Sequence, residues 1–342
     1  EGMDLPGTGT ATEVVAWYNG HPEFSHLPVD LSHERAAIIG NGNVAFDVAR
    51  ILTADPDALA RTDISDHALA ALRDSKVREV VVVARRGPIH SAFTLPELIG
   101  LTATCDVVLD AADHELVRQA LETETDALTR HKLEILAKLA DSSAPATRPR
   151  IRLAYQLTPT RVLGSDKVTG IEFTVTGTDE VRQLDAGLVL TSIGYHGKAI
   201  RDLPFDDAAG VVPNDEGRVI DPATGNPVRG SYVAGWIKRG PTGFIGTNKS
   251  CAAHTVDRLV ADYNASRLGE PTAKNGALQH LIRDRRPDVV DMAGWRAIDA
   301  AEIARGGADR PRDKFIDVSD MLAAAGNAPK PTLRQRLLGA FS

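Results

Sequence analysis

The sequence has few of the features that mark disulfide-rich, metal-binding or membrane-spanning proteins. Its 342 residues include two cysteines, Cys105 and Cys251, and no CxxC motif. This usage argues against a redox disulfide and against a cysteine-based zinc or iron–sulfur site, and it fits a reducing compartment. No apolar run approaches the ~20 residues that a membrane helix needs. We therefore expect a cytoplasmic protein with no metal site and no membrane span.

A basic excess and an N-terminal targeting signal are also absent. The formal net charge of −7 argues against a nucleic-acid partner, because nucleic-acid-binding proteins usually carry an excess of positive charge. The opening residues, EGMDLPGTGT, contain neither a basic nor an apolar stretch and do not form a signal peptide. The chain is long enough for two domains, each with its own core.

The hydrophobic pattern predicts an α/β fold with a parallel sheet. A strand at 36–40, a glycine turn, a helix at 43–54 and a strand at 78–84 follow one another, as in Rossmann-type domains. Extra helix is expected at 57–75, with a second piece starting near Ser65. The other expected elements are loops at 1–10 and 141–149, hairpins and turns at 211–230, strands at 106–109, 150–154, 168–176 and 187–192, and helices at 11–19, 94–101, 113–140, 247–263, 277–285, 295–305 and 317–325.

The first strand–helix junction carries the pattern Gly40-x-Gly42-x-x-Ala45. In dinucleotide-binding folds the first glycine permits a tight turn, and the second lets a pyrophosphate approach the backbone. The N–H groups around Asn43 and Val44 would face that anion at the positive end of the helix. The alternative is a tight turn that binds nothing.

The second strand ends in Arg85-Arg86-Gly87-Pro88. An acidic residue at this place binds the ribose hydroxyl of NAD, whereas arginine suits the 2′-phosphate of NADP. The distance from Gly40 exceeds the usual ~20 residues, which the extra helix at 57–75 explains. A solvated arginine pair is the alternative. Glu97 could bond the ribose or orient an arginine, or it could be an ordinary surface residue.

A glycine-rich loop at 234–249 lies between a strand and a long helix. Its N–H groups and the positive helix end could stabilise negative charge on a reduced flavin. Trp236 offers a flat apolar surface for a cofactor ring. The alternative places Trp236 in the core and makes the loop an ordinary turn.

These motifs together resemble the adrenodoxin reductase family, which includes bacterial NADPH–ferredoxin reductases. The quoted matches are GNGNVAxDVAR at 40–50, RRGPxxxAFTxxEL at 85–98, SIGY at 192–195 and GWIKRGPTGxIGTNK at 235–249, with further matches near both ends of the chain. The resemblance implies an FAD enzyme that oxidises NADPH and passes single electrons to ferredoxin. It implies no catalytic acid–base residue, since flavin and nicotinamide carry the chemistry. The cofactor residues it implies are Asn41, Gly42, Asn43 and Val44 for the NADP pyrophosphate, Arg85, Arg86 and Glu97 for the 2′-phosphate pocket, and Trp236, Gly243, Phe244 and Ile245 for FAD.

The resemblance also implies a domain arrangement. A linker at 1–10 would lead into a Rossmann-like NADP-binding domain at 11–192, followed at 193–342 by the C-terminal part of a Rossmann-like FAD domain. The family's N-terminal FAD fingerprint is not found in this sequence, so we expect a portion of a longer reductase that alone holds FAD weakly or not at all. The alternative function is an NADP-binding fragment without turnover. A different electron acceptor is a further alternative, although the missing CxxC disfavours a disulfide.

A locally basic region could steer an acidic ferredoxin, or it could be a solvated helix face and loop. Its members are Arg130, His131, Lys132, Lys138, Arg148, Arg150 and Arg152.

Overall fold

The computed structural model describes residues 1–326 except 144–145, 244, 270–272 and 274–275. The chain divides into two compact units. One unit comprises Glu1–Ile193 together with the residues from Val290 onward, and the other comprises Gly194–Val289. The predicted domain assignment concerns which cofactor each part binds, so it stays a prediction.

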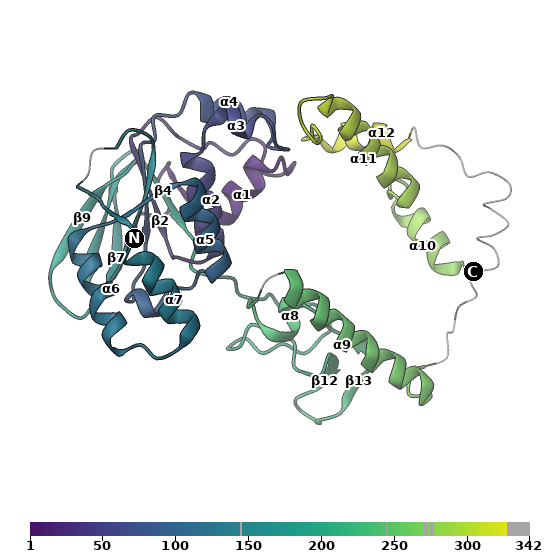
Figure 1. The fold of residues 1–342 in the computed structure, drawn as a ribbon. Helices are drawn as coiled ribbons and strands as arrows, with labels where there is room; N and C mark the ends of the chain where they lie inside the picture. The colour runs from purple at the N-terminus through teal and green to yellow at the C-terminus, as the bar shows by residue number, and fades with distance from the viewer. Residues whose placement is uncertain (144–145, 244, 270–272, 274–275, 327–342) are drawn as a thin grey trace. The chain divides into compact units, whose positions relative to one another are not determined.

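The first unit is built on a seven-stranded parallel sheet (Figure 1). The carboxyl ends of its central strands share one edge, because Thr191, Ile39, Val83 and Ala154 are in register. In a parallel α/β sheet this edge is where ligands bind. The strand order is β1 (Thr8–Thr10), β10 (Leu188–Thr191), β2 (Arg35–Ile39), β3 (Glu79–Val83), β6 (Arg150–Ala154), β4 (Asp106–Leu109) and β5 (Ala140–Asp141).

Different layers cover the two faces of this sheet. Alternate side chains of a strand point to opposite faces, so Val80 and Val82 pack with the helices while Val81 and Val83 pack with a second sheet. The second sheet is antiparallel and consists of β7 (Leu157–Gly164), β8 (Val168–Val175) and β9 (Val181–Asp185). The elements on the helical side are α1 (Ala11–Tyr18), α2 (Asn43–Thr53), α3 (Pro56–Leu59), α4 (Asp66–Arg73), η1 (Pro88–His90), α5 (Leu95–Thr104), α6 (Ala111–Thr123) and α7 (Ala127–Leu136).

The C-terminal part of the first unit contains α11 (Met292–Gly306) and α12 (Val318–Gly326). The segment after α11 is held against the sequence that precedes α4. Arg310 pairs with Asp66 at 2.5 Å and donates to the carbonyl of Thr62, and the ammonium of Lys314 lies 3.2 Å from Asp63. These polar contacts connect the segment to the rest of the unit.

The second unit has a small core. Three valines, Val212, Val219 and Val233, are buried together. The elements are β11 (Asn214–Asp215), β12 (Arg218–Ile220), β13 (Pro227–Tyr232), α8 (Trp236–Arg239), α9 (Ile245–Asn264) and α10 (Ala277–Arg285). The carboxylate of Asp262 accepts two hydrogen bonds of 2.7 Å from Arg218 and one of 2.6 Å from the Tyr232 hydroxyl. These bonds fix the long helix α9, which carries Asp262, to a three-stranded sheet of β11, β12 and β13.

The expected secondary structure is wrong in several places, including the loop expected at 234–249, which contains the short helix α8. The helix expected at 113–140 is two helices, because Asp126 caps a new helix by accepting from the N–H of Thr129 at 2.8 Å. The loop expected at 1–10 ends in strand β1, and Asp141, expected in a loop, belongs to β5. Strands β7 and β9 were not expected, since neither shows a run of apolar residues.

Candidate cofactor-binding sites

The glycine turn after β2 leaves the start of helix α2 open. Gly40 has φ +113°, and a Cβ there would lie 2.1 Å from the carbonyl oxygen of Ser192, so no other residue fits. A Cβ at Gly42 would meet nothing within 4 Å, and the residue makes no side-chain cap on α2. The N–H groups at the first turn of α2, including those of Asn43 and Val44, are therefore available to an anion.

Two asparagines brace this turn against the segment before α5. The Oδ1 of Asn41 accepts from the N–H of Ala92 at 3.3 Å, and the Oδ1 of Asn43 accepts from the N–H of Thr94 at 2.9 Å. The side-chain nitrogen of Asn41 is shielded from solvent and has no hydrogen-bond partner among the described residues. A buried donor without a partner is costly, so the turn fits a ligand oxygen at this place. Sequence reasoning missed Ala92 and Thr94, although the AFT of the second motif contains them.

Arg85 and Arg86 follow β3, which is paired in register with β2, and both are exposed. Within the described part of the chain, neither guanidinium takes part in an ion pair. Their backbone is fixed: the Thr176 hydroxyl donates to the carbonyl of Arg85 at 2.8 Å, and the N–H of Gln156 donates to that of Arg86 at 3.4 Å. The pair is thus anchored at the binding edge, with its charge open to a phosphate.

Glu97 is engaged elsewhere. Its carboxylate accepts from Arg50 of α2 at 3.2 Å, and Arg50 also lies 3.5 Å from Asp47. Burial is the main cause that raises the pKa of Asp47 above its usual value. Glu97 therefore ties α5 to α2, and the arginine it orients is Arg50 rather than Arg85 or Arg86.

The predicted FAD residues that the structure describes lie in the second unit. Gly235 caps α8 at φ +73° and leads into Trp236, whose exposed fraction is 41% and whose ring lies 5.0 Å from that of Tyr195. The alternative that buries Trp236 in the core is wrong. At Gly243 (φ +85°) a Cβ would lie within 3 Å of the side chain of Thr247, so this turn also requires glycine. An exposed ring beside glycine turns fits a planar cofactor.

Two of the predicted FAD residues cannot be placed in full. Phe244 lies outside the described residues. Ile245 is the first residue of α9, and its side chain is not described. Their predicted contact with FAD stays a prediction.

The basic region is largely committed to internal contacts. Arg150 and Arg152 both approach Glu79, and Arg152 also pairs with Asp110 at 2.7 Å. Lys132 is half-buried and donates to backbone carbonyls, and Arg130 pairs with Glu134. These contacts favour the interpretation as a structural and solvated face over that of a ferredoxin-steering patch.

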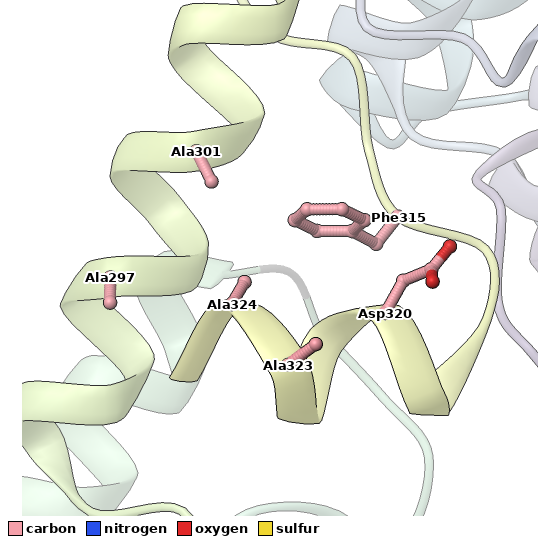
Figure 2. A pocket seen from close by; sticks show the side chains of 6 residues that line it. All are labelled: Ala297, Ala301, Phe315, Asp320, Ala323 and Ala324. Atoms are coloured by element: carbon pink, nitrogen blue, oxygen red, sulfur yellow. The ribbon is translucent and has the colours of Figure 1, made fainter. Parts of the chain in front are cut away.

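A pocket of about 610 Å³ beside α11 and α12 is lined by none of the predicted cofactor residues (Figure 2). Small side chains and one aromatic ring line it, namely Ala297, Ala301, Phe315, Asp320, Ala323 and Ala324. It has a single charged group, so it offers no polar set that could orient a nucleotide.

The described residues offer neither a metal-ligand cluster nor a membrane-spanning helix. They contain no group of three or more His, Cys, Asp or Glu side chains able to hold a metal ion. None of the described helices has the length and apolar character needed to span a bilayer.

Comparison with known proteins identifies the family of the chain. No family model matches it. It is 69% identical over 342 residues to the "Probable ferredoxin/ferredoxin--NADP reductase" of Mycobacterium tuberculosis, with 99% of the chain and 60% of the relative covered. It is 40% identical to the NADPH-ferredoxin reductase FprA of the same species, with 94% of the chain and 74% of the relative covered. The chain belongs to the NADPH–ferredoxin reductase family.

Structure agrees with sequence on this family. The solved structure of Mycobacterium tuberculosis FprA in complex with NADPH matches with a TM-score of 0.84 at 38% identity, covering 95% of this chain and 75% of that one. The resemblance to NADPH–ferredoxin reductases and the predicted α/β class with a parallel sheet are thereby confirmed. The chain spans about 60% of the length of the curated relatives that it matches at 69% identity.

Proposed function

We propose that the protein is an NADPH-dependent flavoprotein reductase that passes single electrons to a ferredoxin. The observation that carries the proposal is the pairing, on adjacent strands, of an uncapped helix start with two exposed arginines. The first suits a pyrophosphate and the second suits the 2′-phosphate that distinguishes NADP from NAD.

The residues divide into two groups under this proposal. Asn41, Gly42, Asn43 and Val44 would hold the pyrophosphate, and Arg85 and Arg86 would hold the 2′-phosphate, with Glu97 acting through Arg50. The FAD residues would be Trp236, Gly243, Phe244 and Ile245. FAD, when bound, would supply the hydride acceptor and the one-electron steps. The protein's contribution is to bind, orient and shield, without a catalytic acid or base.

The partner and the location follow from the same proposal. The relatives are named as ferredoxin reductases, so an iron–sulfur ferredoxin is the proposed acceptor. Those names do not favour a binding module without turnover. Both cysteines are free thiols, which fits the proposed cytoplasmic location.

The test is the double variant Arg85→Ala/Arg86→Ala, with binding of NADP⁺ and NAD⁺ measured by calorimetry. Loss of two charge-assisted contacts should lower the affinity for NADP⁺ by roughly 100-fold or more and the affinity for NAD⁺ by less than about threefold. A matched control replaces the exposed Arg61 and Arg148 by Ala, which should leave both affinities unchanged. Equal losses for the two nucleotides would defeat the assignment of the arginine pair.

A further inference from the structure

Four residues between the arginine pair and α5 connect the two halves of the nucleotide site. This 91–94 segment consists of Ser91, Ala92, Phe93 and Thr94. The N–H groups of Ala92 and Thr94 point to the glycine turn, where they donate to Asn41 and Asn43. The orientation of both asparagines therefore depends on the position of this segment.

The carbonyl groups of the segment are held by a lysine from another helix. The ammonium of Lys132, on α7, donates to the carbonyl of Ser91 at 3.2 Å and to that of Phe93 at 3.4 Å. The same ammonium lies 5.5 Å from the centre of the Phe93 ring, within reach of a cation–π contact. One side chain thus fixes the segment on either side of Ala92.

Phe93 carries the contact on to α2. Its ring is fully buried and stacks on Phe46 of α2, with centroids 4.5 Å apart. The segment therefore contacts α2 in two places. The N–H of Thr94 donates to Asn43, the first residue of α2, and the Phe93 ring stacks on Phe46 inside the helix. A shift of the segment would disturb both contacts together.

Lys132 forms no ion pair with a carboxylate within the described residues, and its ammonium contacts the two carbonyls and the Phe93 ring instead. Burial lowers its pKa, and Asp126 at the start of α7 partly opposes that change. The other titratable groups near the segment are Tyr155, whose hydroxyl lies 3.2 Å from that of Ser91, and Asp113, which accepts from the N–H of Tyr155. Burial raises the pKa of Tyr155, so this hydroxyl stays protonated at alkaline pH.

We propose that Lys132 is a positioning residue for the pyrophosphate half of the nucleotide site, acting through the 91–94 segment on Asn41 and Asn43. The inference rests on the proposed function, because it assumes that the glycine turn binds a dinucleotide. It assigns Lys132 to the nucleotide site rather than to a partner surface. Since the pyrophosphate is common to NADP⁺ and NAD⁺, Lys132 supports both nucleotides equally, whereas the arginine pair selects one.

The experiment compares Lys132→Met with the wild-type chain by calorimetric titration of NADP⁺ and NAD⁺ at pH 8. We expect both dissociation constants to rise about tenfold, with their ratio unchanged. The matched control is Lys76→Met, the same change at an exposed lysine before β3. Unchanged affinity in Lys132→Met, or a loss confined to NADP⁺, overturns the inference. If the wild-type chain itself fails to bind NADP⁺, the proposed function fails, which is a different result.

A second arm does not depend on Lys132→Met folding. Wild-type affinity should fall at alkaline pH with a midpoint below 10.5, the ordinary lysine pKa, while Lys132→Arg should keep its affinity through that range. The same alkaline loss in both proteins would overturn the inference. In a variant that already carries Asn41→Ala and Asn43→Ala, Lys132→Met should raise the dissociation constants by less than a further twofold. The effects of residues that act through one another are not additive. A further tenfold rise in the dissociation constants would show that Lys132 does not act through Asn41 and Asn43.

Discussion

Two tryptophans, one in each unit, lie in opposite surroundings. Trp17 lies on α1 in the first unit with an exposed fraction of 3%, and its carbonyl oxygen lies 3.0 Å from a ring nitrogen of His67. Trp236 starts α8 in the second unit with an exposed fraction of 41%. Burial of a large aromatic stabilises a fold, whereas an exposed ring leaves its apolar surface available to a ligand.

The difference extends to the cores around them. In the first unit a continuous apolar cluster joins α1 to the parallel sheet and to every long helix packed on it. The second unit buries three valines and relies on the Asp262 cluster. The glycine turn therefore stands on a large apolar core, whereas the exposed ring of Trp236 stands on a small one.

The largest effect should come from the buried ring. Trp17→Ala should lower the free energy of unfolding by about 3–5 kcal/mol, because it leaves a cavity in the core of the first unit. Urea unfolding followed by circular dichroism measures this change. Trp17→Phe is the control and should recover most of the loss. A change below about 1 kcal/mol in Trp17→Ala would show that the two tryptophans do not differ as described.

An intermediate effect should come from a buried carboxyl beside the binding edge. Asp113 is 6% exposed, and burial raises its pKa to about 7. Between pH 4 and 7 the folded state holds this proton and the unfolded state does not, so stability falls as pH rises. The titration of Asp113 should lower the free energy of unfolding by about 2–3 kcal/mol between pH 5 and pH 8. Asp113→Asn keeps an acceptor for the N–H of Tyr155 and should remove that pH dependence.

Unfolding curves at several pH values measure the effect of Asp113→Asn. The exposed Asp166, replaced by Asn, is the control and should leave the slope of stability against pH as in the wild type. If Asp113→Asn retained the full loss of stability between pH 5 and pH 8, the carboxyl would not be the group that titrates.

Local sequence signals predicted the frame of the first unit well. The strand, glycine turn and helix at 35–53 were predictable because the apolar periods and the two glycines lie within twenty residues. The break between α6 and α7 depends on one capping carboxylate, Asp126, inside an otherwise helical pattern. Strand β9 is mostly exposed, so it has no apolar alternation to reveal it.

The candidate site was predictable only where a motif encodes it. Gly40–Val44 and the arginine pair lie in contiguous patterns, and the structure places them on adjacent strands. The bonds from Asn41 and Asn43 to the 91–94 segment span 51 residues, and those from Lys132 span about 40. The spacing of apolar residues along the sequence cannot predict such contacts, because they arise from tertiary packing. The engagement of Glu97 with Arg50 was hidden for the same reason.

The smallest effect should come from the exposed ring of the second unit. Trp236→Ala removes little buried surface and one contact with Tyr195, so the free energy of unfolding should change by about 1 kcal/mol or less. Urea unfolding of this variant beside Trp17→Ala measures the contrast directly, with Trp236→Phe as the conservative control. A loss of 3 kcal/mol or more would mean that Trp236 supports the fold. The ring would then be a structural element of the second unit, and its place in the proposed FAD site would have to be given up.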